Sequence, residues 1–137
     1  MKSINAILCI STVFFMLACK KDEVAEPTVN LSQQIAGTYK LTSVLRNNTL
    51  ADVTSTATGS ATITAKDNTT AQISYTLAFG VNQQLIATDY QISKNGSDFK
   101  LVNSAGEDAV VQGSKLKMII TFTTLASSQK YIVEYTK

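Results

Sequence analysis

The chain of 137 residues contains no histidine and no tryptophan, and its two cysteines, Cys9 and Cys19, both lie near its beginning. The rest of the chain therefore lacks the imidazole and thiol groups that most often act as general base, nucleophile or metal ligand. Glu107 and Asp108 are the one adjacent pair of acids in the body, and no spaced acidic pattern of a calcium loop accompanies them. We predict that the chain is not an enzyme and that it binds neither a metal nor a cofactor.

Charge is also scarce. Charged residues make up 16% of the sequence, and the formal net charge is +2. Lys115 and Lys117 share one face of a predicted strand, but two lysines are too few for an electrostatic footprint on a phosphate backbone. The sequence therefore gives no reason to expect a nucleic-acid partner.

The opening segment differs in character from everything after it. Lys2 precedes a mostly apolar stretch that ends at Ala18 and is shorter than the roughly 20 residues needed to span a bilayer. This pattern is typical of a secretory signal peptide, here residues 1–18. Its last four residues, Met16-Leu17-Ala18-Cys19, resemble the lipobox of bacterial lipoproteins. The resemblance implies that Cys19 becomes the N-terminus and carries acyl chains such as palmitate that anchor it in a membrane; the alternative is an ordinary signal peptide that happens to contain a cysteine.

Residues 19–30 contain the only proline, Pro27, and show no apolar periodicity, so we predict a flexible tether. The run Lys20-Lys21-Asp22-Glu23 resembles an export signal that sends lipoproteins of one Gram-negative phylum to the cell surface. The alternative is a charged, solvated spacer. We expect an outer-membrane lipoprotein of a Gram-negative bacterium. The resemblance to the export signal implies display on the cell surface, and the charged-spacer alternative leaves open which side of the membrane the protein faces.

From Gly37 onward, apolar residues recur at every second position, which is the period of strands with one buried face. The pattern is most regular over residues 71–79, and Asn95-Gly96 predicts a two-residue hairpin turn. Residues 31–36 suit a short helix with Asn30 as its N-cap. In the first strand the pattern places Tyr39, Leu41 and Leu45 inward and Lys40, Thr42 and Arg46 outward. We predict one all-β domain, residues 31–137, folded as an antiparallel up-and-down barrel of eight strands, with a β-sandwich as the alternative.

All aromatic residues of this domain fall on the apolar phase of their strands. They could line a lumen that binds a guest molecule, or they could simply fill the core. The candidate lumen residues are Tyr39, Tyr75, Phe79, Tyr90, Phe99, Met118, Phe122, Tyr131 and Tyr135.

The stretch Ile35-Ala36-Gly37-Thr38-Tyr39-Lys40-Leu41 resembles the start of lipocalin-like domains, and residues 115–123 and 130–136 look like the final hairpin of that family. The resemblance implies a barrel whose closed end is sealed by an aromatic residue under a basic side chain. Tyr39 stands where the family has tryptophan. Because the sole arginine, Arg46, lies on the first strand, we expect Lys137 or Lys130 to supply the basic group.

Two functions follow as hypotheses. The first is a membrane-anchored lipoprotein that binds or carries a small hydrophobic or amphipathic ligand, which requires a cavity of about 300 Å³ or more. The second is a cell-surface structural or interaction module with a filled core that docks a protein or glycan through an exposed apolar patch. Ile119 and Ile132 are out of phase with the buried residues and are the candidates for such a patch.

Overall fold

The computed structural model describes residues 29–137. The predicted signal peptide, the lipidation site at Cys19 and most of the tether lie outside the described residues. A short helix, α1 (Leu31–Ile35), precedes the strands, and a 3-10 turn, η1 (Thr54–Thr56), follows the first of them. The strands are β1 (Gly37–Arg46), β2 (Ala57–Ala65), β3 (Thr70–Phe79), β4 (Asn82–Asn95), β5 (Asp98–Asn103), β6 (Asp108–Gln112), β7 (Lys115–Thr123) and β8 (Ser128–Thr136).

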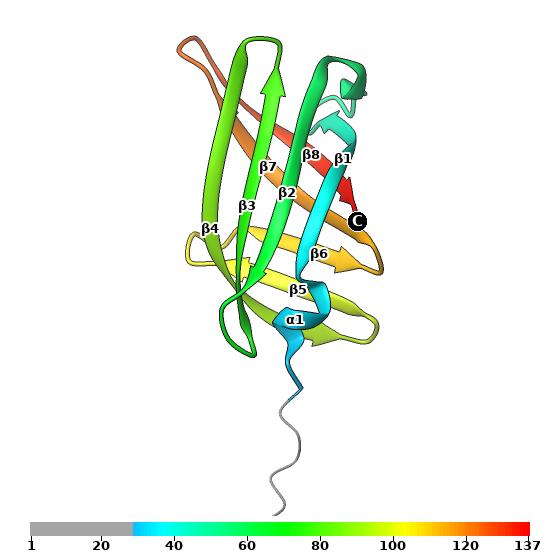
Figure 1. Cartoon of the computed structure of the whole chain (residues 1–137). Helices are drawn as coiled ribbons and strands as arrows, with labels where there is room; N and C mark the ends of the chain where they lie inside the picture. The colour runs from blue at the N-terminus through cyan, green and yellow to red at the C-terminus, as the bar shows by residue number, and fades with distance from the viewer. Residues whose placement is uncertain (1–28) are drawn as a thin grey trace, which may run out of the picture.

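The eight strands form a closed barrel in which each strand pairs antiparallel with the next and β8 pairs with β1 (Figure 1). Closure occurs through residues 40–46 of β1 and residues 131–136 of β8. The predicted up-and-down barrel is therefore confirmed, and the sandwich alternative is excluded. None of the helices within residues 29–137 has the length and apolar character required to cross a bilayer.

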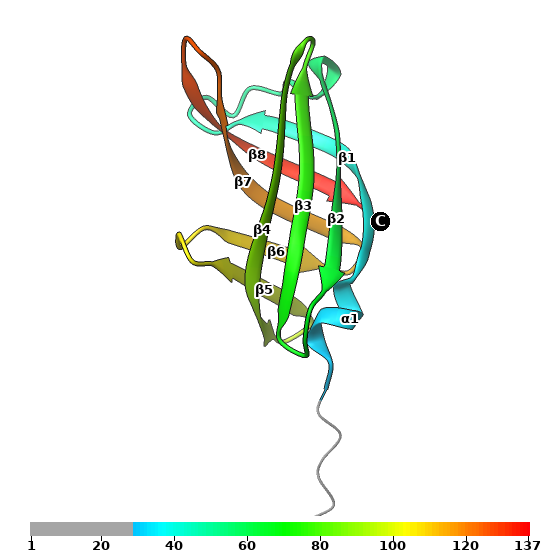
Figure 2. The same cartoon turned by 60° about the vertical axis from the view of Figure 1, so that its left-hand side comes forward.

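Helix α1 covers one end of the barrel, which we call the closed end (Figures 1 and 2). As predicted, Asn30 caps the helix, because its side chain accepts a hydrogen bond from the Gln33 amide. The Ser32 hydroxyl donates to the Asp67 carbonyl in the β2–β3 turn, and the Ile35 side chain is buried in the core. These contacts fix the helix against the barrel.

A bulge in β1 changes which residues face the interior. Leu41 lies opposite Tyr135, and Ser43 lies opposite Glu134, the residue just before Tyr135. Two steps along β1 therefore match one step along β8, and the register shifts between Leu41 and Ser43. The extra residue reverses the alternation of side chains. Val44 is consequently fully buried, and Arg46 lies directly opposite the buried Tyr131. The predictions that Leu45 faces inward and Arg46 outward were wrong.

The hairpin between β4 and β5 is present, but its turn lies one residue later than predicted. Asn95 pairs with Asp98 as the last residue of β4, which leaves Gly96 and Ser97 as the loop. Only Gly96 has a positive φ, of 63°. A glycine of positive φ at the first loop position is the pattern of a type II′ turn.

Strands β5 and β6 are short and lie toward the closed end (Figure 2). Pairing of β4 with β5 begins at Tyr90, and β7 pairs with β6 only up to Met118. We call the line between residues 82–89 and residues 119–123 the seam. The Gln84 side-chain amide donates to the Thr121 carbonyl at 3.1 Å and so links β4 to β7 across it.

Candidate functional site

The closed end is sealed by the side chains of Tyr39 and Lys137. The Tyr39 hydroxyl donates to the Ile35 carbonyl at 2.6 Å, and burial raises the pKa of this phenol. The Lys137 ammonium lies 5.8 Å from the centre of the Tyr39 ring and donates to the Ala36 carbonyl at 2.6 Å. Lys137 therefore supplies the basic group expected over Tyr39. Lys130 does not, because it pairs with Thr121 near the other end of β8.

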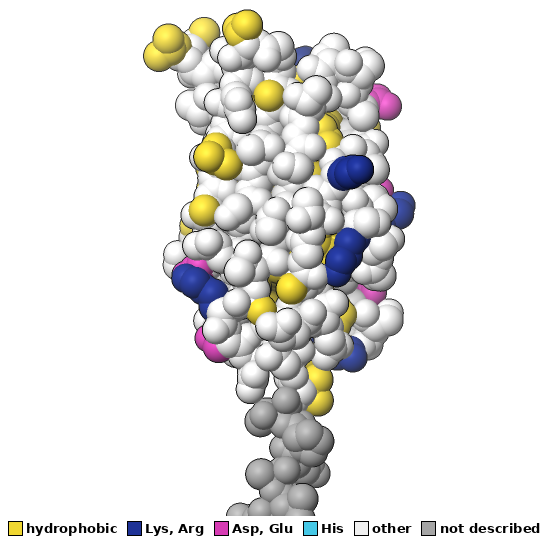
Figure 3. Space-filling model, viewed as in Figure 1, with side chains coloured by type: hydrophobic (Ala, Val, Ile, Leu, Met, Phe, Trp, Pro, Cys, Tyr) yellow, Lys and Arg dark blue, Asp and Glu magenta, His cyan; other side chains and the backbone are white. Residues whose placement is uncertain are grey.

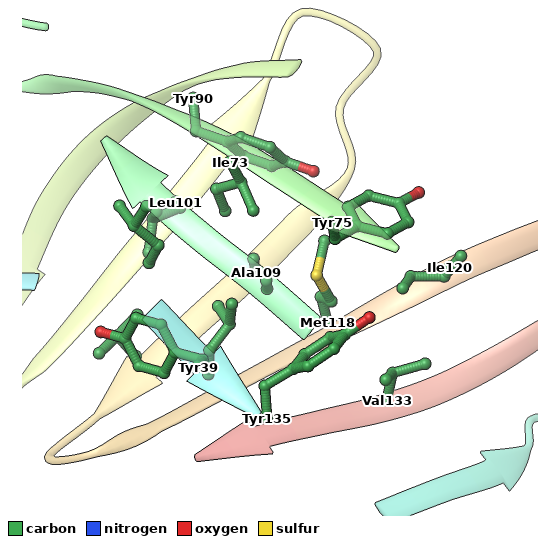
Figure 4. Close-up of a cluster of buried hydrophobic side chains, with 14 of the residues drawn as sticks. Tyr39, Ile73, Tyr75, Tyr90, Leu101, Ala109, Met118, Ile120, Val133 and Tyr135 are labelled. Atoms are coloured by element: carbon green, nitrogen blue, oxygen red, sulfur yellow. The ribbon is translucent and has the colours of Figure 1, made fainter. Parts of the chain in front are cut away.

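The middle of the barrel is filled by side chains (Figure 4). The candidate lumen residues Tyr75, Tyr90 and Met118 are buried there, and Tyr135 has no exposed surface. Burial raises the pKa of Tyr75 to about 12, with smaller contributions from Tyr90 and Glu107. Burial also raises the pKa of Tyr135 strongly. At neutral pH these phenols are uncharged core groups.

One hydrogen bond crosses this core from β8 to β3. The Tyr135 hydroxyl donates to the Thr76 carbonyl at 3.1 Å. In the neighbouring β2–β3 pair, the Ser60 amide donates to the Thr76 hydroxyl at 3.0 Å. Gly59 makes room for this arrangement, because a Cβ atom at that position would collide with the Thr76 carbonyl oxygen.

Three aromatic residues gather at the end of the barrel opposite α1, and we call this end the mouth. The Phe79 ring lies 5.2 Å from Phe122 in an edge-to-face arrangement and 4.9 Å from Tyr131, measured between ring centroids. The three rings border a pocket of about 140 Å³, together with Asn82, Gln129 and residues of the β7–β8 turn. This volume is below the 300 Å³ expected for a lumen that holds a drug-sized ligand, so the mouth pocket does not meet that expectation and has room only for a smaller molecule.

The nine candidate lumen residues therefore separate into two groups. Phe79, Phe122 and Tyr131 border the mouth pocket, and the other six are core residues, Phe99 being the most exposed of them at 9%. Whether any of the nine contacts a ligand stays a prediction. The pattern of alternation placed all of them on the inner face, but it could not show how completely their neighbours fill the space.

Two inward-facing polar side chains with an unpartnered buried atom, Arg46 and Gln84, were missed from the sequence. Arg46 is opposite Tyr131, and Gln84 is opposite the fully buried Leu77. The Arg46 Nε and the Gln84 Oε1 are both buried, and neither has a hydrogen-bond partner among the described residues. The only sequence signal for Arg46 was its being the single arginine of the chain.

The outer surface carries a few exposed apolar side chains, most of them near the mouth. Val81 and Leu125 are fully exposed on the β3–β4 and β7–β8 turns, and both border a shallow depression of about 460 Å³. Hydrophobic atoms gather at these upper tips in Figure 3. Ile119 and Ile132 lie opposite each other on the outer face, and Ile119 is 48% exposed.

A larger hollow of about 630 Å³ lies where β4 separates from β5, and polar side chains such as Gln72, Asp89 and Gln91 contribute to its wall. Within residues 29–137, no three acidic, histidine or cysteine residues are grouped in a way that could hold a metal ion.

Comparison with solved structures relates the barrel to a siderocalin, Ex-FABP, described as functioning through dual ligand specificities. The two chains share 12% identity with a TM-score of 0.50, over 75% of this chain and 73% of the other. The fold is lipocalin-like. No protein-family model and no curated protein matches the sequence. The likeness to the siderocalin therefore establishes only the fold of this lipocalin-like barrel.

Proposed function

We propose that this lipocalin-like barrel binds a small amphipathic molecule at its mouth. The observation that carries the proposal is the pocket of about 140 Å³ bordered by Phe79, Phe122 and Tyr131 above a filled core. Aromatic rings offer large apolar surfaces, and the hydroxyl of Tyr131 and the amides of Asn82 and Gln129 place polar groups beside them. The fold likeness to a siderocalin with two ligand specificities supports a binding role.

Native mass spectrometry of residues 24–137, purified gently, tests this function, because these residues include all eight strands and their shared core. We expect an added mass that is lost on denaturation and is reduced by Phe122→Leu. Phe99→Leu is the matched control, because Phe99 lies on β5 and outside the mouth pocket. A mass without any addition for the wild type, with no binding of added small amphiphiles, would contradict the proposal.

We also propose that the barrel is held at a membrane through a lipid on Cys19, in the outer membrane of a Gram-negative bacterium. The lipobox-like segment that ends at Cys19 supports this. In the native host, we expect the intact mass of the detergent-extracted protein to match a chain that begins at Cys19 and bears acyl groups. Cys19→Ala should leave the protein unacylated, whereas Cys9→Ala should not affect acylation. Protease treatment of intact cells then tests surface display.

The second candidate function is an interaction module that docks a protein or glycan. The exposure of Val81 and Leu125 beside one depression favours it. A consistently empty mouth in the mass spectra would direct the search to this surface. We then expect Val81→Ser and Leu125→Ser to weaken partner binding without lowering the stability of the barrel, because neither side chain is buried.

A further inference from the structure

The mouth contains a cation that the barrel itself does not neutralise. Residues opposite each other in an antiparallel pair point to the same side of the sheet, so Arg46 shares the inner face with Tyr131. The Nε atom of Arg46 is buried and has no hydrogen-bond partner within residues 29–137. The three salt bridges of this region, which involve Lys66, Lys100 and Lys115, do not include it.

The acid nearest to Arg46 in the sheet register does not supply a counter-charge. Asp52 forms an isolated bridge with Leu45, which lies on the outer side of β1 after the bulge. The Asp52 carboxylate instead accepts a hydrogen bond from the Thr54 amide at 2.8 Å. Hydrogen bonding by the Thr54 side chain, and then by this amide, lowers the pKa of Asp52. A buried guanidinium donor without a partner is costly unless an anion or water satisfies it.

The apolar half of a ligand site lies directly beside this cation. Tyr131 is both the cross-strand neighbour of Arg46 and a wall of the mouth pocket. Side chains opposite each other in a sheet have Cβ atoms about 4.5–5.5 Å apart, so one small molecule can contact both. A pocket of about 140 Å³ is close to the size of an engineered cavity of about 150 Å³ that accepts benzene. Edge-to-face packing like that of Phe79 and Phe122 also suits a further aromatic ring.

We infer that the mouth binds a small organic anion, whose acidic group pairs with Arg46 and whose single ring or short chain occupies the pocket among Phe79, Phe122 and Tyr131. This inference rests on the proposed binding function and gives it a ligand class. Guanidinium groups recognise carboxylates through paired hydrogen bonds, which a neutral alcohol cannot reproduce. The filled core excludes a long chain from the interior, so the apolar part must be short.

Calorimetric titration of residues 24–137 with phenylacetate and with its neutral counterpart phenylethanol tests the inference. We expect the wild type to bind the anion at least about tenfold more tightly, as a charge-assisted hydrogen bond in a partly buried site allows. Arg46→Gln should remove this preference and leave phenylethanol binding nearly unchanged. Lys130→Gln is the matched control. Lys130 is the exposed residue next to Tyr131 on β8, so this substitution removes a cation from the outer face and should retain the preference for the anion.

The outcomes separate this inference from the function on which it rests. Equal affinity of the wild type for both probes would overturn the anion assignment and leave small-molecule binding intact. Binding of neither probe would overturn the inference and weaken the proposed function with it. Because the comparison of the two probes uses the wild type, it does not depend on the folding of Arg46→Gln. If the preference for phenylacetate over phenylethanol survives in Arg46→Gln but disappears in Lys130→Gln, the anion binds at the outer face, and this result would also overturn the inference.

Discussion

Removing one hydroxyl from the core tests how the barrel is held together across its interior. The Tyr135→Phe substitution deletes the donor to the Thr76 carbonyl and changes no apolar surface of the ring. An acceptor left unsatisfied in a buried place costs about 1–3 kcal/mol of unfolding free energy. At this chain length each kcal/mol corresponds to roughly 4 °C, so we expect the Tm to fall by about 4–12 °C.

Thermal and urea denaturation followed by circular dichroism measure this loss. Tyr131→Phe is the matched control, because its hydroxyl donates to the Gln129 side chain at the mouth, where water can replace it. The control should change the unfolding free energy by less than about 0.5 kcal/mol. Equal losses in the two variants, or an unchanged Tm for Tyr135→Phe, would refute the argument that the bond to Thr76 braces β8 against β3.

Three further predictions concern the pH dependence and the packing of the barrel. The pKa of Tyr75 rises from 10.0 in its ordinary state to about 12 in the folded protein, so the unfolded chain loses this proton first. The free energy of unfolding should therefore fall between pH 10 and pH 12, by up to about 3 kcal/mol from this group, and urea titrations of Tyr75→Phe should show a smaller fall. Gly59→Ala should destabilise the barrel by about 1–3 kcal/mol in the same assay, because its Cβ would displace the Thr76 carbonyl; a neutral effect would contradict the close contact. Lys137→Met should lower the free energy of unfolding by about 1 kcal/mol, because it removes the contact with the Tyr39 ring and the hydrogen bond to the Ala36 carbonyl. Lys130→Met, at the other end of β8, should leave the free energy of unfolding unchanged.

The alternation of apolar residues was enough to predict most of the architecture. The period of two over residues 71–79 placed Ile73, Tyr75 and Leu77 correctly on the inner face, because each strand buries only one side. The helix and its Asn30 cap depend on contacts within four residues, and these too were predictable. Features determined by neighbours in the sequence are the ones that sequence patterns report.

The features that the sequence did not reveal depend on residues far apart in the chain. The bulge in β1 is defined by the register against β8, about 90 residues later, and it turned Arg46 inward. The size of the mouth pocket depends on how side chains from β3, β7 and β8 interdigitate, which no local pattern records. The ligand class that we infer therefore rests on features that only the tertiary structure shows.

The seam is a weak line in the wall of the barrel. Strand β2 is paired with β3 along its whole length, whereas residues 82–89 and residues 119–123 are bridged by the side chain of Gln84. Separating these two segments breaks few backbone hydrogen bonds, so the free energy of local opening is small. Amide hydrogens along this edge of β4 should therefore exchange with solvent sooner than those between β2 and β3. Because the seam runs up to the mouth, its opening would let a molecule held there, as proposed above, leave sideways while α1, Tyr39 and Lys137 keep the opposite end shut.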